Sequence, residues 1–259
     1  MEQIEPALFY TGVAAQAYGL LRGTGAPDPA PYARFIQRSG QPALELGCGD
    51  GDPLLALRTL GLEVDGVDSS PDMVDRCRAT AAERGIDVTV WVQRMEALDL
   101  PRRYRSVFLA GPTFNLLPDD DTAMQALAGI RRHLVVEGTA MIPLFEPLAT
   151  PLEHFGRRRT RTASDGTEMS VTAVRETRDE TTRCQTTVLR YEVATPTGTV
   201  SEDRPWTVHW YPQAGIRAMA AEAGLTVARV LSAAGGAADD SETDIVLLLH
   251  RDDADASPP

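Results

Sequence analysis

Residues 44–52 decide the fold, and they read Leu44-Glu45-Leu46-Gly47-Cys48-Gly49-Asp50-Gly51-Asp52. The apolar residues at 43–46 predict a short strand, and the leucines at 54–60 have the spacing of a helix. Glycines at alternate positions between them let the backbone turn sharply and let a ligand approach the bare main chain. A strand, a glycine loop and a helix in this order indicate an α/β fold whose loop binds a small ligand.

Patterns of strands and helices alternate from residue 43 to residue 145 and resume after residue 211. The predicted strands span 43–46, 62–67, 88–92, 106–110 and 138–145, with a closing pair at 225–231 and 244–250. The predicted helices span 31–39, 54–60, 73–84, 121–134 and 213–223. Strands that alternate with helices at this spacing imply a parallel sheet covered by helices on both faces.

The segments around this core differ from it in composition. Residues 150–211 are rich in threonine and valine with period-two alternation, which predicts an antiparallel β insert rather than a separate domain. The first residues carry aromatic side chains and a proline-rich stretch that interrupts any helix. The predicted division is an N-terminal helical segment at 1–40, a core at 41–149 and 212–251, the insert at 150–211 and a disordered acidic tail at 252–259.

The composition disfavours several classes of function. The chain of 259 residues has a net charge of −12, whereas nucleic-acid binders usually carry a basic surface. Its basic residues are arginines without any lysine, which excludes a P-loop lysine or a lysine Schiff base. Distant cysteines and scattered histidines form neither a disulfide framework nor a metal-binding pattern. The N-terminus carries acids in place of a basic signal peptide, so we expect a cytoplasmic protein that neither crosses nor binds a membrane.

A carboxylate lies at the end of the second predicted strand. Asp68 comes 23 residues after Glu45, about where a nucleoside-binding α/β fold places the acid for the ribose hydroxyls. A carboxylate accepts hydrogen bonds from both hydroxyls at once. The glycine spacing is not that of dinucleotide-binding proteins, and Asp50 and Asp52 disfavour a pyrophosphate. These acids favour a ligand with a cationic centre.

Residues 45–51 and the following run Gly66-Val67-Asp68-Ser69-Ser70-Pro71-Asp72-Met73 resemble the first two motifs of class I S-adenosylmethionine-dependent methyltransferases. The resemblance is most specific over 40–146 and looser over 1–39 and 150–250. It implies a Rossmann-like seven-stranded sheet whose last strand is antiparallel, flanked by helices, with S-adenosyl-L-methionine as the cofactor.

The same resemblance implies roles for individual residues. Glu45 would order the loop near the methionine amine, and Gly47 and Gly49 would line the methionine moiety. Asp68 would hold the ribose, and Met73 would pack near the adenine. The other residues that we predict to contact the cofactor lie in the same loops or at neighbouring strand ends: Cys48, Gly51, Ser69, Met95, Glu96 and Ala110.

Two positions depart from the family pattern. The third strand in this family commonly ends with an aspartate that accepts from the adenine amino group, but here Arg94 stands in that place. Either Glu96 or the backbone replaces the aspartate, or Arg94 points away. The fourth strand also begins with Tyr104-Arg105-Ser106-Val107, where the family often has an aspartate.

The acceptor is predicted from the loop after the fourth strand. This loop lacks the Asn/Asp-Pro-Pro-aromatic run of enzymes that methylate nucleobases, and 113–115 is more similar to small-molecule N-methyltransferases of the antibiotic aminosugar and glycine types. Those relatives carry an aromatic N-terminal lid, which resembles 1–40, and an antiparallel insert. The candidate catalytic residues are Tyr10, Tyr18 and His209, and the candidate substrate-binding residues are Phe114, Asn115, Trp210 and Tyr211.

Several interpretations stay open. The favoured function is methyl transfer to an amine of a natural product or metabolite, with proximity and alignment as the main catalytic effect. O- or C-methylation of a small molecule, methylation of RNA or protein, a cyclase or non-methylating cofactor-binding protein, and a nicotinamide oxidoreductase are the alternatives. The arginine run at 157–161 would suit an anionic substrate, although a solvated strand is the simpler interpretation. The insert would act either as part of the lid or as an interface for a homo-oligomer.

Overall fold

The structure is a computed structural model that describes residues 5–22, 28–163, 166–195, 198–232 and 235–251. The predicted tail at 252–259 lies outside the described residues. None of the described helices is long and apolar enough to span a membrane.

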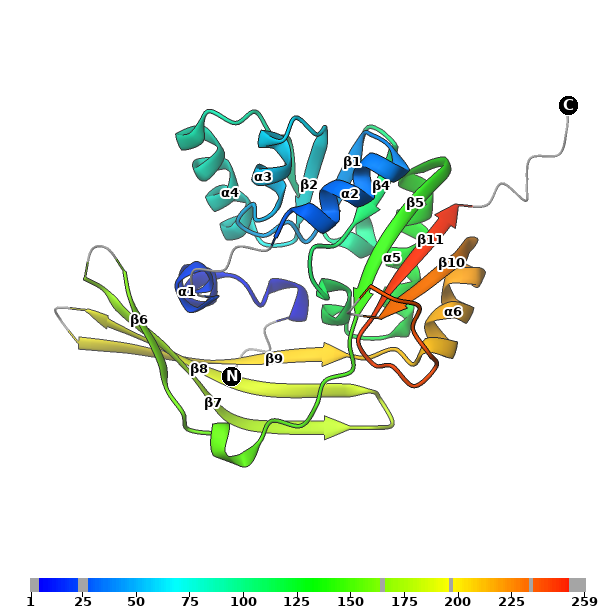
Figure 1. Cartoon of the computed structure of the whole chain (residues 1–259). Helices are drawn as coiled ribbons and strands as arrows, with labels where there is room; N and C mark the ends of the chain where they lie inside the picture. Colours follow the sequence, from blue (N-terminus) through cyan, green and yellow to red (C-terminus); the bar gives the residue numbers. More distant parts are fainter. Residues whose placement is uncertain (1–4, 23–27, 164–165, 196–197, 233–234, 252–259) are drawn as a thin grey trace, which may run out of the picture.

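The core is a seven-stranded sheet with the order β10-β11-β5-β4-β1-β2-β3 (Figure 1). Its strands are β1 (Ala43–Leu46), β2 (Val64–Asp68), β3 (Val90–Val92), β4 (Tyr104–Phe108), β5 (Leu134–Leu144), β10 (Leu225–Ser232) and β11 (Ile245–Arg251). The pairs from β3 to β5 are parallel, and β11 runs antiparallel to both β5 and β10. This topology confirms the predicted Rossmann-like sheet with an antiparallel last strand.

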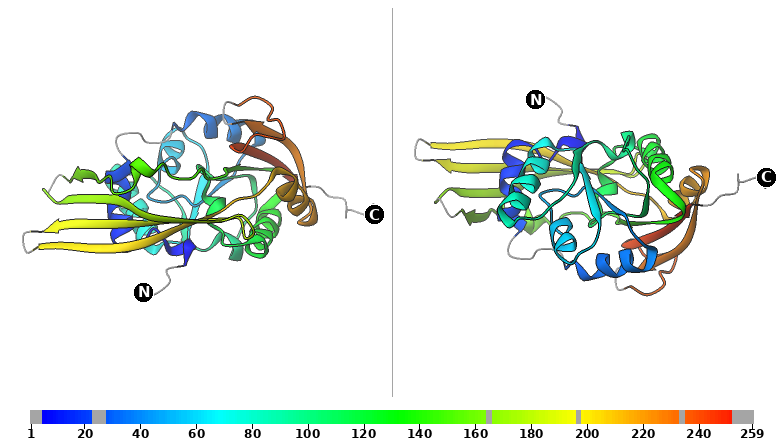
Figure 2. Two further views of the ribbon diagram at one scale, coloured as in Figure 1. Left: turned by 90° about the horizontal axis from the view of Figure 1, so that it is seen from below. Right: turned by 90° about the horizontal axis from the view of Figure 1, so that it is seen from above.

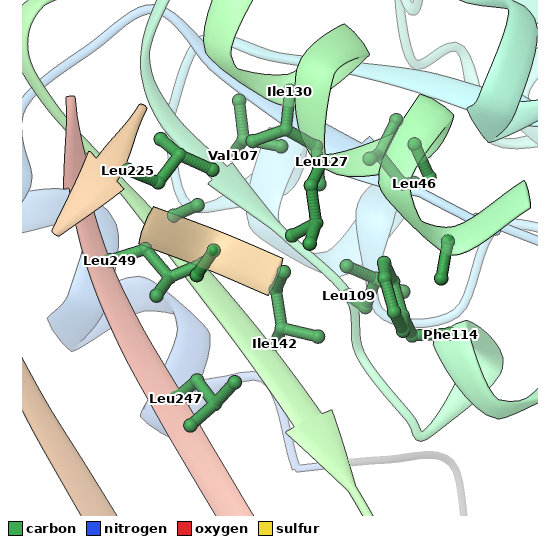
Figure 3. Close-up of a cluster of buried hydrophobic side chains, with 14 of the residues drawn as sticks. Leu46, Val107, Leu109, Phe114, Leu127, Ile130, Ile142, Leu225, Leu247 and Leu249 are labelled. Carbon is green, nitrogen blue, oxygen red and sulfur yellow. The ribbon is translucent and has the colours of Figure 1, made fainter. Parts of the chain in front are cut away.

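Helices cover both faces of this sheet (Figures 1 and 2). The helices are α1 (Gly12–Arg22), α2 (Ala30–Ser39), α3 (Leu54–Thr59), α4 (Pro71–Arg84), α5 (Asp120–His133) and α6 (Gln213–Glu222), with short 3-10 turns η1 (Pro6–Leu8), η2 (Met95–Ala97), η3 (Thr113–Leu116) and η4 (Leu152–His154). Helices α5 and α6 pack on one face, where Val107 faces Leu127 and Ile130 (Figure 3). Helices α2, α3 and α4 pack on the other face, which receives Phe108. Adjacent residues of β4 thus point to opposite layers, as strand geometry requires.

Some predicted boundaries are displaced. The fifth strand begins at Leu134 rather than 138, because α5 passes into β5 without an intervening loop. The fourth strand spans 104–108 rather than 106–110.

Side chains near the ends of this strand hold it to its neighbours. Tyr104 is fully buried and its hydroxyl donates to Asp65 at 3.0 Å, while the carbonyl of Ala110 accepts from the hydroxyl of Tyr32 at 2.6 Å. Helix α2 belongs to the predicted N-terminal segment but packs on the core sheet through this contact and a stacked Tyr32–Phe108 pair.

The insert is a four-stranded antiparallel sheet, as predicted, with the order β6-β7-β8-β9 (Figure 1). Its strands are β6 (Arg159–Thr162), β7 (Glu168–Asp179), β8 (Cys184–Thr195) and β9 (Gly198–His209). Helix α1 lies between this sheet and the core (Figures 1 and 2). Phe9, Ala14 and Ala17 pack there against Met169, Val171 and Tyr191. The N-terminal segment therefore joins the insert to the edge of the core at which the parallel strands end.

Candidate functional site

The loop between β1 and α3 keeps its backbone exposed toward a cavity. Gly47 has a φ of +70° and Gly49 a φ of +55°, values that residues other than glycine rarely adopt. A Cβ on Gly47 would lie 2.7 Å from Thr113 Cγ2, whereas one on Gly49 would meet only Met73 Cε, at 3.4 Å. Both glycines line the same cavity as Asp68 and Met73. The loop therefore presents main chain to whatever occupies that cavity.

Two other loop residues serve packing inside the protein. A Cβ on Gly51 would lie 2.9 Å from Cys77 Sγ and from Leu55 Cδ1, so the helices α3 and α4 require glycine there. The side chain of Cys48 is buried in the cluster beneath α3 and α4. Both were predicted to contact the cofactor, and neither lines the cavities beside the loop.

Asp68 connects the ends of the first two strands. Its Oδ2 accepts from the Gly49 amide and its Oδ1 from the Ser70 amide, both at 2.8 Å. Burial raises the pKa of Asp68, although these two hydrogen bonds favour the ionised form. Each carboxylate oxygen has a second lone pair. Asp68 can therefore hold the glycine loop and still accept from ligand hydroxyls.

Glu45 is fully buried, and among the described residues neither of its carboxylate oxygens has a hydrogen-bond partner. Burial raises the pKa of Glu45 well above its usual range, and the charges of Asp68 and Asp52 raise it further. An ionised carboxylate in this position is costly unless a cation or a donor accompanies it. Glu45 therefore fits a ligand that brings a positively charged group to the loop.

Two cavities border the loop, and a third adjoins them on the side of the insert. The narrow cavity, about 50 Å³, borders Asp68, Ser69, Met95 and Glu96. The central cavity, about 240 Å³, borders Gly47, Gly49, Asp68 and Met73. The insert cavity, about 460 Å³, lies between α1 and the insert sheet. Tyr10 borders all three, and the residues common to the central and insert cavities are Tyr10, Tyr18, Phe145 and Trp206.

The two predicted tyrosines lie where the central and insert cavities meet. Their ring centroids are 5.0 Å apart in an edge-to-face arrangement, and Phe9 packs against Tyr10 at 4.9 Å. Burial raises the pKa of Tyr10, and the nearby Tyr18, Tyr191 and Asp68 raise it further. The Tyr10 hydroxyl is therefore neutral and can donate or accept a hydrogen bond.

Hydrogen bonds from both the core and the insert hold the chain around Tyr10. The Ser70 hydroxyl donates to the Tyr10 carbonyl and the Gly12 amide donates to Asp72, each at 2.6 Å. From the insert, Arg204 Nη1 donates to the Phe9 carbonyl at 2.8 Å. The core and the insert thus position the same short segment. Ser69, predicted to contact the cofactor, also donates to the Ala7 carbonyl while lining the narrow cavity.

Arg94 forms an ion pair with Glu5 in the N-terminal segment, and its Nη1 lies 3.8 Å from Glu96. It does not line the cavities beside the loop, whereas Glu96 and Gln93 border the narrow one. Of the two explanations for the family departure, the structure favours an Arg94 that points away. Ala110, also predicted at this edge, lines none of the three cavities.

Five predicted catalytic or substrate-binding residues line none of the three cavities: Phe114, Asn115, His209, Trp210 and Tyr211. Asn115 Nδ2 donates to the carbonyls of Phe145 and His209 at 2.9 and 2.8 Å, which ties the ends of β5 and β9 together. The placement gives these residues a structural role at the junction of core and insert.

The aromatic members of this junction pack on one another. Phe114 and Tyr211 have ring centroids 5.4 Å apart, and the Arg178 guanidinium lies 4.1 Å from the Trp210 ring. His209 is 2% exposed, and burial lowers its pKa, as does the charge of Arg183. A neutral, buried imidazole that lines none of the three cavities is not placed for a catalytic role.

Sequence reasoning missed Trp206, which borders the central and insert cavities. Its indole Nε1 is buried, and no acceptor for it lies among the described residues. A signal was available, because the alternation of β9 places Trp206 and Val208 on one face and His209 on the other. Thr187 and Gln185, which oppose them on β8, also line the insert cavity.

Comparison with known proteins extends these findings. Residues 43–138 match the family described as "Methyltransferase domain". Cypemycin N-terminal methyltransferase from Streptomyces sp is 28% identical over 224 residues, which cover 85% of this chain and 88% of that protein.

Two solved structures share the fold over nearly the whole chain. The CcbJ methyltransferase from Streptomyces caelestis has a TM-score of 0.73 at 24% identity and covers 95% of this chain and 98% of its own. CalS10 is an amino pentose methyltransferase from Micromonospora echinaspora whose structure was solved with S-adenosylmethionine bound. It has a TM-score of 0.66 at 21% identity, and the match covers 94% of this chain and 98% of CalS10. The likeness includes the insert as well as the core sheet.

Proposed function

Because the chain belongs to the class I S-adenosylmethionine-dependent methyltransferases, we propose that it methylates an amine nitrogen of a small natural product or metabolite held in the insert cavity. The observation that carries this proposal is the pair Tyr10 and Tyr18, which stands between a glycine-lined cavity and a larger, mostly apolar one. When bound, S-adenosylmethionine supplies a methyl group already activated by a sulfonium centre.

The residues around the loop fit this cofactor. Gly47 and Gly49 offer bare backbone to the methionine part, and Asp68 can accept from the ribose hydroxyls. Glu45 supplies the buried negative charge that the amino group and sulfonium of the cofactor would neutralise. Met95 and Glu96 border the narrow cavity and are placed to contact the adenosine end.

The residues between the cavities align the acceptor. The two cavities meet where both are lined by the same four residues, Tyr10, Tyr18, Phe145 and Trp206. Holding two reactants in line contributes up to roughly 7–11 kcal/mol in favourable cases. The neutral hydroxyl of Tyr10 can accept an N–H of the acceptor and so direct the nitrogen lone pair into the central cavity.

Two observations support nitrogen over oxygen as the acceptor atom. A hydroxyl acceptor needs a general base, whereas a neutral amine already has a nucleophilic lone pair. The raised pKa of Tyr10 makes its hydroxyl unsuitable as that base. Cypemycin N-terminal methyltransferase and the amino pentose enzyme are both named for amine-bearing acceptors.

The test is a screen of small primary and secondary amines, each with its matched alcohol, that follows S-adenosylhomocysteine formation and locates the new methyl by mass spectrometry. We expect turnover of amines. The Tyr10→Phe, Tyr18→Phe double variant should lower kcat/KM for the acceptor by about 10- to 100-fold, since each lost hydrogen bond is worth roughly 0.5–1.5 kcal/mol.

Tyr32→Phe is the matched control, because that hydroxyl donates to the Ala110 carbonyl away from the cavities. It should leave turnover unchanged. Methylation of the alcohols alone, or full turnover by the double variant, would contradict the proposal.

A further inference from the structure

Two arginines at the outer end of the insert, Arg157 and Arg159, have no acidic partner among the described residues. Arg159 lies on the edge strand β6 opposite Val171 and borders the insert cavity. It also borders an adjoining cavity of about 470 Å³, together with Arg157 and His154. The two cavities share Arg159, Val171, Ala173 and Leu189, so they form one continuous groove over the sheet.

Five other arginines of the insert form ion pairs. Arg158 lies 3.3 Å from Glu192, and Arg190 lies 2.7 Å from Asp203. Arg178, Arg183 and Arg204 also have carboxylate partners. Arg157 and Arg159 form no ion pair with any described residue, although the chain contains 37 Asp and Glu residues. The positive charge in this groove is therefore available to a ligand.

The rest of the insert cavity is uncharged. Thr150, Gln185 and Thr187 are its polar side chains apart from the tyrosines and Trp206, and Arg159 is the one charged residue that borders it in the described chain. Tyr191 lies in the same row of the sheet as Arg159, two strands away, because both pair with Val171. Burial raises the pKa of Tyr191 to about 12, so its hydroxyl stays protonated and can donate to an anion.

Sheet register sets the distance between the two ends of the groove. From Trp206 on β9 to Arg159 on β6 there are three strand spacings, about 14 Å. Trp206 pairs with Thr187, whereas the row of Arg159 passes through Tyr191, four residues further along β8 and about 13 Å away. A ligand that reaches both ends must be elongated.

We propose, resting on the proposed function, that the acceptor carries an oxyanion, a carboxylate or a phosphate ester, at the end remote from its reactive amine. Arg159 binds this group, and Arg157 and Tyr191 assist it. An arginine fork matches the two oxygens of such an anion, which fixes orientation as well as adding attraction.

The test uses one amine in three forms: 8-aminooctanoate, its methyl ester and 8-aminooctyl phosphate, with the 6-carbon and 11-carbon carboxylate and ester pairs as length controls. Binding to protein saturated with S-adenosylhomocysteine is measured by calorimetry, and turnover with S-adenosylmethionine is measured for each compound. We expect at least a tenfold preference for an anionic form over the ester. Whether the carboxylate or the phosphate is favoured identifies the source of the oxyanion.

Arg159→Gln should abolish this preference by weakening the binding of the anionic forms, and Arg159→Lys should retain part of it. Arg161→Gln is the matched control, because Arg161 lies two residues further along the same strand, donates to the Thr160 carbonyl and borders neither cavity. That variant should behave as the wild type.

Equal handling of anion and ester by the wild type, or an unchanged preference in Arg159→Gln, would overturn the proposal. So would the failure of every anionic probe to bind while the cofactor binds normally. Failure of the proposed function would show itself separately, as an absence of cofactor binding or as methylation at an atom other than nitrogen.

Discussion

The two sides of the Tyr10–Tyr18 pair recognise ligands in different ways. On the side of the glycine loop, main chain and the carboxylate of Asp68 border the cavity, and the carboxylate of Glu45 is buried at the end of β1. On the side of the insert, aromatic, aliphatic and neutral polar side chains form the wall, with Arg159 at its edge. The first side is the one that we propose for the cationic cofactor. The second is built by packing, and it leaves room for a larger and less defined molecule.

The largest effect should come from the first side. Gly47→Val places a side chain at φ +70° and against Thr113, so it should lower cofactor affinity by roughly 100-fold or more, about 2.7 kcal/mol. Calorimetry measures this loss. Gly61→Val is the control, because Gly61 has φ +79° with open space around it. It should cost about 1–2 kcal/mol of stability from backbone strain and leave affinity unchanged. Equal losses of cofactor affinity in both variants would show that the glycine loop does not contact the cofactor.

Glu45→Gln should have opposite effects on stability and on binding. Because its pKa is raised, Glu45 keeps its proton in the folded apoprotein at pH values where the unfolded chain has lost it. The free energy of unfolding therefore falls as the pH rises from the ordinary pKa of 4.5 to the raised pKa of the folded protein. Glutamine does not ionise, so the variant does not lose this stability, and its apoprotein should have a higher melting temperature than the wild type at neutral pH. It should also bind the cofactor about 10- to 100-fold more weakly, since a charge-assisted contact is worth roughly 1.5–3 kcal/mol.

The pH dependence sharpens the same test. Wild-type cofactor affinity should rise with pH as Glu45 ionises, and in Glu45→Gln this rise should shrink to the part contributed by Asp68, whose pKa burial also raises. Thermal melts of the apoprotein and titrations of the cofactor at several pH values measure both effects. A variant that is less stable and binds as tightly as the wild type would show that Glu45 has a different partner.

A smaller effect should appear on the insert side. Trp206→Phe removes the unpartnered indole donor but keeps an aromatic ring, so it should lower kcat/KM for the acceptor by about 3- to 10-fold, the worth of one hydrogen bond. Cofactor affinity should stay the same. Trp210→Phe, whose ring packs on Arg178 outside the cavities, should leave kcat/KM unchanged. If steady-state kinetics showed a lower kcat/KM for Trp210→Phe and an unchanged one for Trp206→Phe, the acceptor would not bind in the insert cavity.

The smallest effect is expected at Arg94. Its ion pair with Glu5 is solvent-exposed, and such pairs contribute about 0–1 kcal/mol. Arg94→Gln should therefore change cofactor affinity by less than about fivefold. A loss comparable to that of Gly47→Val would mean that Arg94 contacts the cofactor after all.

The two regions also differ in how far sequence predicts them. The loop residues 45–51 and 66–73 are short contiguous motifs, so their strand, turn and helix follow from local spacing, and Asp68 is placed beside the loop by parallel pairing of β1 and β2. The insert was predicted as antiparallel strands, but its register was not. Register decides which face each residue occupies, because a shift of one residue exchanges the two faces.

His209 and Trp206 show the consequence. Both lie on β9 in one aromatic run, yet only Trp206 faces the cavities, while His209 is enclosed beside Tyr211. Arg94 shows a second limit. Its partner Glu5 is 89 positions away, and no local pattern predicts a contact across that separation. The junction formed by Asn115 is likewise a product of tertiary packing, because its amide bonds to β5 and β9 partners far along the chain.

The most direct measurement is a calorimetric titration of S-adenosylmethionine, and then S-adenosylhomocysteine, into the wild type and into Gly47→Val. We expect both ligands to bind at one site in the wild type and neither to bind in the variant. Ligand at 100 times its dissociation constant should also stabilise the wild type by about 2.7 kcal/mol in a thermal melt. A folded wild type that binds neither ligand at millimolar concentration, or a Gly47→Val protein that binds both normally, would contradict it.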